Sequence, residues 1–204
     1  MQKTNTQKLK GKDFVTIGIF SIIFFVVFLV VSMLVTPFIA VIYPFIGGIC
    51  ALFMAPVYML MTYKVAKRGA VLLFATVVGL IYAIMGYVFM LPIIIVAGIL
   101  CEVVLWKREK YRSFWHNAAS YSVFSVLVFV GTAYIPIYVF GTEYYMKLWS
   151  DSSETAVIHI TFAMSPLWVA ATVVVTVAAA IIGSLIGRRL LRKHFIKAGL
   201  ISTE

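Results

Sequence analysis

Residues 14–63 read FVTIGIFSIIFFVVFLVVSMLVTPFIAVIYPFIGGICALFMAPVYMLMTY, a run of 50 residues without a charged side chain. A helix needs about 20 apolar residues to cross the ~30 Å hydrocarbon core of a bilayer, so this run is long enough for two spans. Pro37 disfavours helix in the residue before it, which places the corner between the two spans at Thr36-Pro37. The run therefore predicts an all-α integral membrane protein.

Further charge-free runs follow along the chain. Gly69–Cys101 is interrupted at Met90-Leu91-Pro92, which favours two short spans over one long span. The predicted transmembrane helices cover residues 14–35, 38–62, 70–89, 92–106, 115–140 and 162–187, and a predicted outer loop covers residues 141–161. We expect these six transmembrane helices to pack into a single domain over residues 1–204.

Sixteen of the 17 Lys and Arg residues fall in four clusters, at residues 3–12, 64–68, 107–112 and 188–197. Cytoplasmic loops of membrane proteins carry an excess of Lys and Arg. Six spans place all four clusters on one side, whereas five or seven spans would leave at least one cluster outside. We therefore expect both the N-terminus and the C-terminus to be cytoplasmic, in a multi-pass protein of a bacterial or archaeal cell membrane. The net charge of +10 does not indicate nucleic-acid binding, because the basic residues flank apolar runs.

The sequence carries no catalytic motif. It contains no G-x-x-x-x-G-K-[ST] of a P-loop, no H-E-x-x-H and no G-x-S-x-G. His116, His159 and His194 lie in three separate segments, and two cysteines are too few for a thiolate metal site. We expect no enzyme activity, no cofactor and no metal site, and any ATP hydrolysis would belong to partner subunits.

Aromatic residues crowd the outer end of the fifth span and the loop after it. Ligand pockets combine aromatic walls with a few polar groups, but Tyr and Trp also gather at any membrane interface. The sequence leaves both interpretations open. The candidate substrate-binding residues are Tyr134, Tyr138, Glu143, Tyr144, Tyr145, Trp149, His159 and Trp168.

Pro37, Pro44 and the Gly47-Gly48 pair gather at the outer end of the second span. Irregular backbone is tolerated at membrane depth where it lines a cavity, so Pro37 and Pro44 are candidates for a gating loop at the mouth of a binding site. An ordinary proline kink is the alternative.

Small residues at four-residue spacing let helices approach closely in lipid. The sixth span carries one such stripe at Ala179, Gly183 and Gly187, and a second stripe begins at Thr176. Packing within the chain explains either stripe. Docking of a partner membrane subunit is the other interpretation, and it makes Ala179, Gly183 and Gly187 the candidate docking residues.

Glu102 is the acid closest to a span interior. An ionisable group in a membrane is a candidate for function. Its position beside Trp106 and five residues before Lys107 also suits an interfacial carboxylate that contacts headgroups or a nearby basic residue. A proton or ion relay is the second interpretation.

Four stretches carry a family resemblance. They are residues 8–20 entering the first span, Lys64-Val-Ala-Lys-Arg-Gly-Ala70, Gly98-Ile-Leu-Cys-Glu102, and Gly183-x-x-x-Gly187 leading to Lys193-His-Phe-Ile-Lys-Ala-Gly199. In these stretches the chain resembles the substrate-binding S components of energy-coupling factor (ECF) transporters, in the Trep_Strep or MptD-like branch. The resemblance runs almost end to end.

This resemblance implies a six-helix subunit that captures a small organic micronutrient or a metal chelate at the extracellular face. Its partners would be an ECF module, made of a membrane coupling subunit and two cytoplasmic ATPases. Many S components contact the coupling subunit through A-x-x-x-A on the first span. Here Gly18 and Ser21 stand three apart, with Ile22 where the second small residue would be, so the resemblance assigns no docking residue to this span.

Two other classes of function fit parts of the pattern. A membrane scaffold or assembly protein would explain the small-residue stripes without a pocket. A stand-alone secondary transporter fits less well, because the spans lack paired intramembrane charges.

Overall fold

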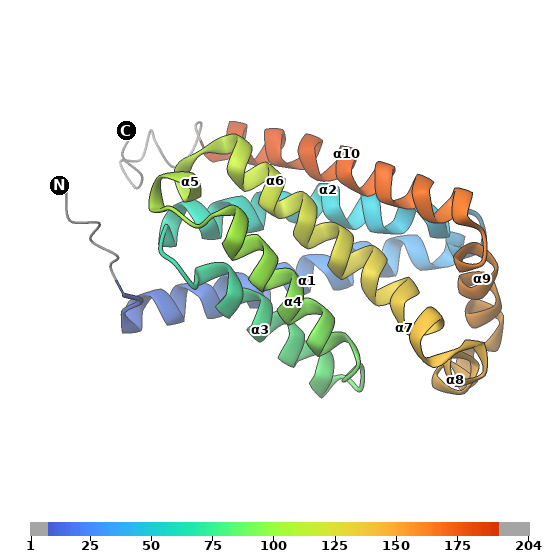
Figure 1. The fold of residues 1–204 in the computed structure, drawn as a ribbon. Coiled ribbons are helices and arrows are strands. Elements are labelled where there is room, and N and C mark those ends of the chain that lie inside the picture. The colour runs from blue at the N-terminus through green and yellow to red at the C-terminus, as the bar shows by residue number, and fades with distance from the viewer. Residues whose placement is uncertain (1–7, 192–204) are drawn as a thin grey trace.

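The computed structural model describes residues 8–191, within which every regular element is helical. Long helical segments run back and forth in one bundle (Figure 1). They are α1 Gly11–Val35, α2 Ile39–Val65, α3 Ala70–Ile84, α4 Met90–Val104, the continuous series α6 Phe114–Ser125, η2 Val126–Gly131 and α7 Thr132–Phe140, and α10 Pro166–Leu190. The shorter helices are η1 Thr36–Phe38, α5 Arg108–Arg112, α8 Thr142–Leu148, η3 Ser150–Ser152 and α9 Ser153–Ala163.

Four stretches are long and apolar enough to cross a membrane. They are Gly11–Phe38, Val41–Val65, Phe114–Phe140 and Pro166–Leu190. Each of them overlaps one of the predicted spans. The prediction of an all-α protein with several membrane-spanning helices is therefore confirmed.

The third predicted span is shorter in the structure, and the fourth keeps its predicted length but begins two residues earlier. α3 and α4 have 15 residues each, which is about 22 Å at a rise of 1.5 Å per residue, against a hydrocarbon core of ~30 Å. The predicted bounds 70–89 and 92–106 place the turn too late, because helix α3 already ends at Ile84. Gly86 lies in this turn with a φ of 98°, a conformation that glycine adopts without steric cost.

The small residues of α10 pack against α2. A Cβ atom built on Gly183 would lie 2.5 Å from the carbonyl oxygen of Leu52, and one built on Gly187 would lie 3.1 Å from Cα of Pro56. Such close approach of two backbones requires glycine. The predicted partner-docking residues Gly183 and Gly187 are thus buried inside this chain, and Ala179 beside them is half-buried. The structure supports helix packing within the chain as the reason for this stripe.

Small residues also allow α3 and α4 to approach closely. A Cβ atom on Gly98 would lie 2.6 Å from Cβ of Ala75, and one on Gly79 would lie 2.8 Å from Cδ1 of Leu91. Helices in lipid gain little from apolar burial and associate through such close contacts. The two short helices therefore form one tight hairpin.

Aromatic rings fill the centre of the bundle. Phe74 of α3 contacts Phe24 of α1 with ring centroids 5.1 Å apart at 86°, and it contacts Phe124 of α6 at 5.7 Å. Tyr58 of α2 packs among these rings, and its hydroxyl lies 2.7 Å from Oγ of Ser120. Ser120 thus gives the buried phenol a hydrogen-bond partner, which a hydroxyl group away from water must find within the protein.

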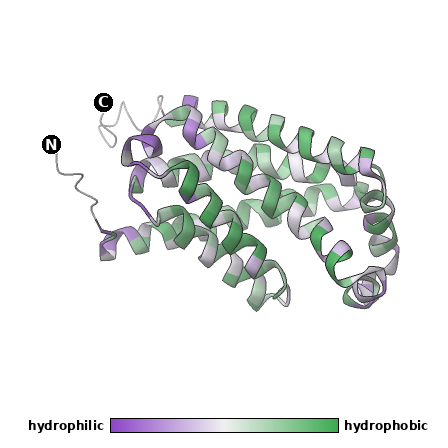
Figure 2. Ribbon diagram, in the orientation of Figure 1, coloured by the Kyte–Doolittle hydropathy of each residue, from purple (hydrophilic) through white to green (hydrophobic). Residues whose placement is uncertain are grey.

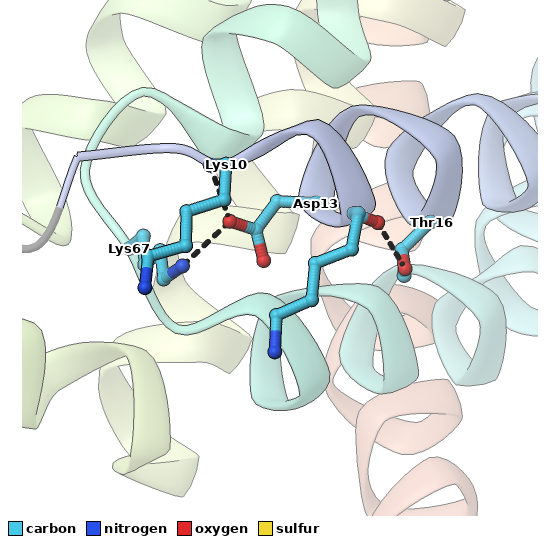
Figure 3. Close-up of polar contacts among 5 residues, drawn as sticks. Lys10, Asp13, Thr16 and Lys67 are labelled. Carbon is cyan, nitrogen blue, oxygen red and sulfur yellow. Dashed lines mark hydrogen bonds and ion pairs between the residues drawn. The ribbon is translucent and has the colours of Figure 1, made fainter.

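The basic clusters gather at one end of the bundle, as far as the described residues include them. This end holds the start of α1, the α2–α3 connection, α5 and the end of α10, and it is the more hydrophilic end (Figures 1 and 2). Polar contacts of Asp13 hold this end together. Its carboxylate accepts hydrogen bonds from the backbone N–H of Lys10 at 2.7 Å and from Nζ of Lys67 at 2.5 Å (Figure 3). Asp13 thereby caps α1 and fixes it to the α2–α3 connection. The basic residues Lys3, Arg192, Lys193 and Lys197, together with His194, lie outside the described residues.

The predicted outer loop at residues 141–161 is itself helical. Gly141 opens it with a φ of 83° and a ψ of 164°, and α8, η3 and α9 follow. These short helices lie across the end of the bundle opposite the basic clusters (Figure 1). They cover the ends of the long helices there.

Candidate ligand cavity

A cavity of about 160 Å³ lies beneath α8 and α9. Eight Phe, Tyr and Trp side chains from α1, α2, α3, η2, α7, α8 and the turns that follow α3 and α8 line it: Phe28, Tyr43, Tyr82, Phe89, Phe129, Tyr134, Tyr145 and Trp149. The π-helical segment η2 contributes two residues, Val128 and Phe129. Such a wider turn inside an α-helix is frequent at functional sites. The cavity is therefore an aromatic chamber at the end of the bundle away from the basic clusters.

His159 of α9 is held on three sides by aromatic rings. Its Nδ1 lies 2.7 Å from the hydroxyl of Tyr145. The ring of Tyr43 stacks on the imidazole with centroids 4.2 Å apart and an interplanar angle of 19°, and Trp149 meets it edge-on at 5.1 Å. These contacts leave His159 only 6% exposed. They fix the ring in one orientation.

Burial lowers the pKa of His159 from 6.5 to about 4, because the charged imidazolium would lose its hydration. The side chain is therefore neutral at physiological pH. A neutral imidazole has one donor and one acceptor nitrogen. Since Nδ1 is engaged by Tyr145, the unpartnered Nε2 provides one further hydrogen-bonding atom. The hydroxyl of Tyr43, whose ring stacks on the imidazole, is also buried without a partner.

Half of the predicted substrate-binding residues line the cavity. They are Tyr134, Tyr145, Trp149 and His159. Tyr134 contacts the ring of Tyr43 with centroids 6.0 Å apart, and its hydroxyl lies 3.4 Å from Oγ1 of Thr172. The structure thus brings these four residues around one space, and their role in binding stays a prediction.

The other predicted residues lie outside the cavity. Tyr138 is 58% exposed and donates its hydroxyl to the carbonyl of Ala163, so it fixes the end of α9. Tyr144 directly precedes Tyr145 on α8. Because neighbouring residues of a helix point in different directions, Tyr145 lines the cavity and Tyr144 does not. Trp168 is 40% exposed and packs on Phe45 and Phe162, and Glu143 is exposed.

Several lining residues were not anticipated from the sequence. Tyr43, Cys50 and Thr172 lie in long apolar helices far from the aromatic segment in sequence, and Phe28 and Phe129 look like ordinary core residues. The polar groups of Tyr43 and Thr172 inside apolar spans are the two features of the sequence that indicate a site there. Phe28 and Phe129 carry no such signal.

The predicted gating residues lie in helix. Pro37 is exposed in the short η1, and Pro44 is buried within α2. The chain passes through both without a loop, so the expected gating loop is absent from this part of the structure. Their neighbours Gly47 and Gly48 contact α10. A Cβ atom built on Gly47 would lie 3.2 Å from Oγ1 of Thr176, and one built on Gly48 would lie 2.8 Å from Cγ1 of Val175. The glycines therefore serve helix contact.

Residues 11–197 match the Trep_Strep family, described as a hypothetical bacterial integral membrane protein. The chain belongs to the Trep_Strep family. This assignment agrees with its four long apolar helices and makes it an integral membrane protein. No curated protein and no solved structure matches the chain.

Glu102 of this Trep_Strep protein caps a helix. Its carboxylate accepts hydrogen bonds from the backbone N–H groups of Gly69 at 3.0 Å, Val71 at 2.8 Å and Leu72 at 3.3 Å, and from the hydroxyl of Tyr111. The first N–H groups of a helix have no partner within the helix and carry a partial positive charge. Glu102 supplies both the acceptors and the negative charge at the start of α3. The geometry supports a structural role at the bundle end.

Residues 8–191 contain no cluster of candidate metal ligands. No group of three or more His, Cys, Asp or Glu side chains in that range is arranged to hold a metal ion. Cys50 and Cys101 are both buried and unpaired, and only Cys50 lines the cavity.

Proposed function

We propose that this protein is the substrate-capture subunit of an importer, the S component of an ECF-type transporter, and that it binds its small-molecule substrate in the aromatic cavity. The observation that carries the proposal is the position of this cavity. Tyr145 of α8 and His159 of α9 line it, and these two helices lie at the end of the bundle that lacks the basic clusters (Figure 1). By the positive-inside rule, this end faces outward.

The proposal includes the membrane arrangement. α1, α2, the series α6–α7 and α10 cross the bilayer, and the α3–α4 hairpin completes a six-helix topology with both termini in the cytoplasm. The end with Asp13, Lys67 and α5 then faces the cytoplasm, where an ATPase module is found. This arrangement is supported by the gathering of the described basic residues at that end.

Energy for uptake is proposed to come from partners. The sequence has no nucleotide-binding motif, so the protein itself is proposed to be no enzyme, and two cytoplasmic ATPases with a membrane coupling subunit would drive substrate release. Copurification of a tagged chain from its native membrane tests this point. Recovery of a coupling subunit and two ATPases is expected, and recovery of the chain alone under several mild detergents would contradict it.

Ligand retention tests the cavity. The chain is purified gently, and native mass spectrometry detects any bound small molecule. The double variant Tyr145→Ala with Trp149→Ala opens the cavity wall, and we expect it to lose the molecule that the unaltered chain retains. Tyr144→Ala with Trp168→Ala removes the same residue types outside the cavity and should retain it. Equal retention by both variants would contradict binding at this site.

Packing within the chain weakens the case for the scaffold function, and a flux measurement tests the transporter function. The small-residue stripe that favoured a scaffold lies at contacts between α10 and α2 of this chain. A stand-alone secondary transporter would show ATP-independent flux in liposomes that contain only this protein. Such flux would overturn the capture proposal.

A further inference from the structure

We infer that the molecule bound in the cavity is an uncharged, planar compound of one ring or two small fused rings that carries hydrogen-bonding groups. This inference rests on the proposed capture function and narrows it. It excludes organic anions, organic cations, metal chelates and tetrapyrroles as substrates.

The first argument is the chemistry of the wall. Rings from α1, α2, α3, α7 and α8 surround the space, among them Phe28, Tyr43, Tyr82, Tyr134 and Tyr145. Aromatic faces gain most from flat partners in offset-stacked or edge-to-face contact. A planar ring system presents such a partner to several of these side chains at once.

The second argument is the lack of charge. No Asp, Glu, Lys or Arg in the described part of the chain lines the cavity. The acidic and basic residues of the cap, which is formed by α8, η3 and α9, are exposed, including Glu143, Lys147 and Glu154. An ion bound in an apolar site without a counter-charge loses its hydration at large cost. A charged substrate has no partner here that would offset this cost.

The third argument comes from unpaired polar atoms. Both Tyr43 and His159 line the cavity, and the Tyr43 hydroxyl and Nε2 of His159 are buried without a hydrogen-bond partner in the structure. Burial keeps His159 neutral, so Nε2 offers one hydrogen bond and no charge. A pure hydrocarbon would leave both groups unpaired, which is unfavourable. The substrate therefore carries a donor or acceptor, such as an amide, a carbonyl or a ring nitrogen.

The fourth argument is size. The cavity measures about 160 Å³. An apolar cavity of about 150 Å³ holds one benzene molecule. A tetrapyrrole or a metal chelate is several times larger than that. A single ring or a compact fused pair matches this volume.

Four probes of equal ring size separate these properties. Benzamide is neutral and forms hydrogen bonds, toluene is neutral and does not, benzoate is an anion, and phenyltrimethylammonium is a cation. Binding to the full-length protein in lipid nanodiscs is followed by the fluorescence of Trp149. For this purpose the exposed Trp106, Trp115 and Trp168 are changed to Phe. The unaltered chain gives a second measurement through the rise in unfolding temperature that a ligand of the folded state produces.

We expect benzamide to bind in the millimolar range and both charged probes to bind at least about tenfold more weakly, which corresponds to about 1.4 kcal/mol. Tyr43→Phe and His159→Leu should each weaken benzamide about tenfold and leave toluene unchanged or tighter. Tyr144→Phe, on the outer face of α8, should change neither. Binding of benzoate or of the cation as tight as that of benzamide would overturn the inference, as would benzamide binding that neither variant affects.

Native mass spectrometry separates the two levels of the proposal. Retention of a charged molecule, a chelate or a lipid acyl chain in the cavity would overturn the substrate class, and a charged molecule or chelate would leave the capture function standing. Failure of all four probes, together with a purified chain that retains no small molecule, would overturn both. Retention of a neutral one- or two-ring compound that is lost in the Tyr145→Ala, Trp149→Ala double variant would support both.

Discussion

His159 is neutral because of what surrounds it. Tyr43, Tyr145 and Trp149 enclose the imidazole and provide one hydrogen bond but no charge, and none of these three side chains ionises between pH 4 and pH 6.5. The pKa of His159 is lowered to about 4. As the pH falls below 6.5, the unfolded chain takes up a proton on this residue while the folded chain does not. Stability is therefore complete above about pH 6.5 and declines toward pH 4.

This linkage predicts a loss of about 3 kcal/mol between pH 6.5 and pH 4, at about 1.4 kcal/mol per unit of pKa shift. Hydrogen exchange of α8 and α9 in the purified protein measures it. His159→Phe keeps the ring stacking and should remove this part of the pH dependence. A variant with the same pH slope as the unaltered chain would contradict the assignment.

Glu102 offers a second test at the level of one residue. Glu102→Gln keeps the shape of the side chain and removes the charge that faces the N–H groups of Gly69, Val71 and Leu72. Hydrogen bonds to a charged group contribute about 2 kcal/mol, so we expect a destabilisation of this order in thermal unfolding. Glu109→Gln changes an exposed acid of α5 and serves as the control. Unchanged stability with loss of transport would favour the proton or ion relay instead.

At the scale of elements, α10 and α2 depend on glycine for their close approach. Gly183→Ala would place a Cβ atom 2.5 Å from the Leu52 carbonyl and 2.8 Å from Cβ of Ala55. Because the obstacle is backbone, the helices must separate, and we expect a loss of about 1–3 kcal/mol. Gly18→Ala on the open face of α1 meets nothing within 4 Å and should be neutral or stabilising. Equal unfolding temperatures for the two variants would contradict this view of the interface.

The position of the turn between α3 and α4 could not be predicted from the hydropathy of the sequence. Charge-free residues continue past Ile84, so hydropathy alone extends the third span to residue 89. The turn is fixed instead by Gly86 and by contacts at the tip, where the ring of Tyr87 lies 6.3 Å from Trp149 of the cap. These contacts lie between segments about 60 residues apart, and local sequence cannot express them.

At the scale of the whole molecule, the proposed orientation predicts a labelling pattern. Single cysteines are placed in a Cys50→Ser, Cys101→Ser background and treated with a membrane-impermeant maleimide. Glu154→Cys on α9 should react in intact cells, and Glu109→Cys on α5 only after permeabilisation, because the positive-inside rule places α5 in the cytoplasm. Reaction of Glu109→Cys in intact cells would invert the topology.

The same experiment tests the depth of the hairpin. Val88 is 62% exposed at the tip of α3–α4. Since helices of 15 residues reach about 22 Å, we expect Val88→Cys to react more slowly from outside than Glu154→Cys. Equal rates would show that the hairpin extends to the outer surface.

The class of the protein, its long apolar helices and the segregation of its basic residues follow from the amino-acid sequence alone, because these depend on composition and on the cost of placing charge in lipid. The sequence also pointed to the segment that holds Tyr145, Trp149 and His159. The packing of the helices is what turns Tyr145 rather than Tyr144 inward and brings Tyr43 and Thr172 to the same cavity. The physical reason is that a cavity is a property of packed helices. Its wall is drawn from segments that are distant in sequence, and its charge and volume exist only once they meet.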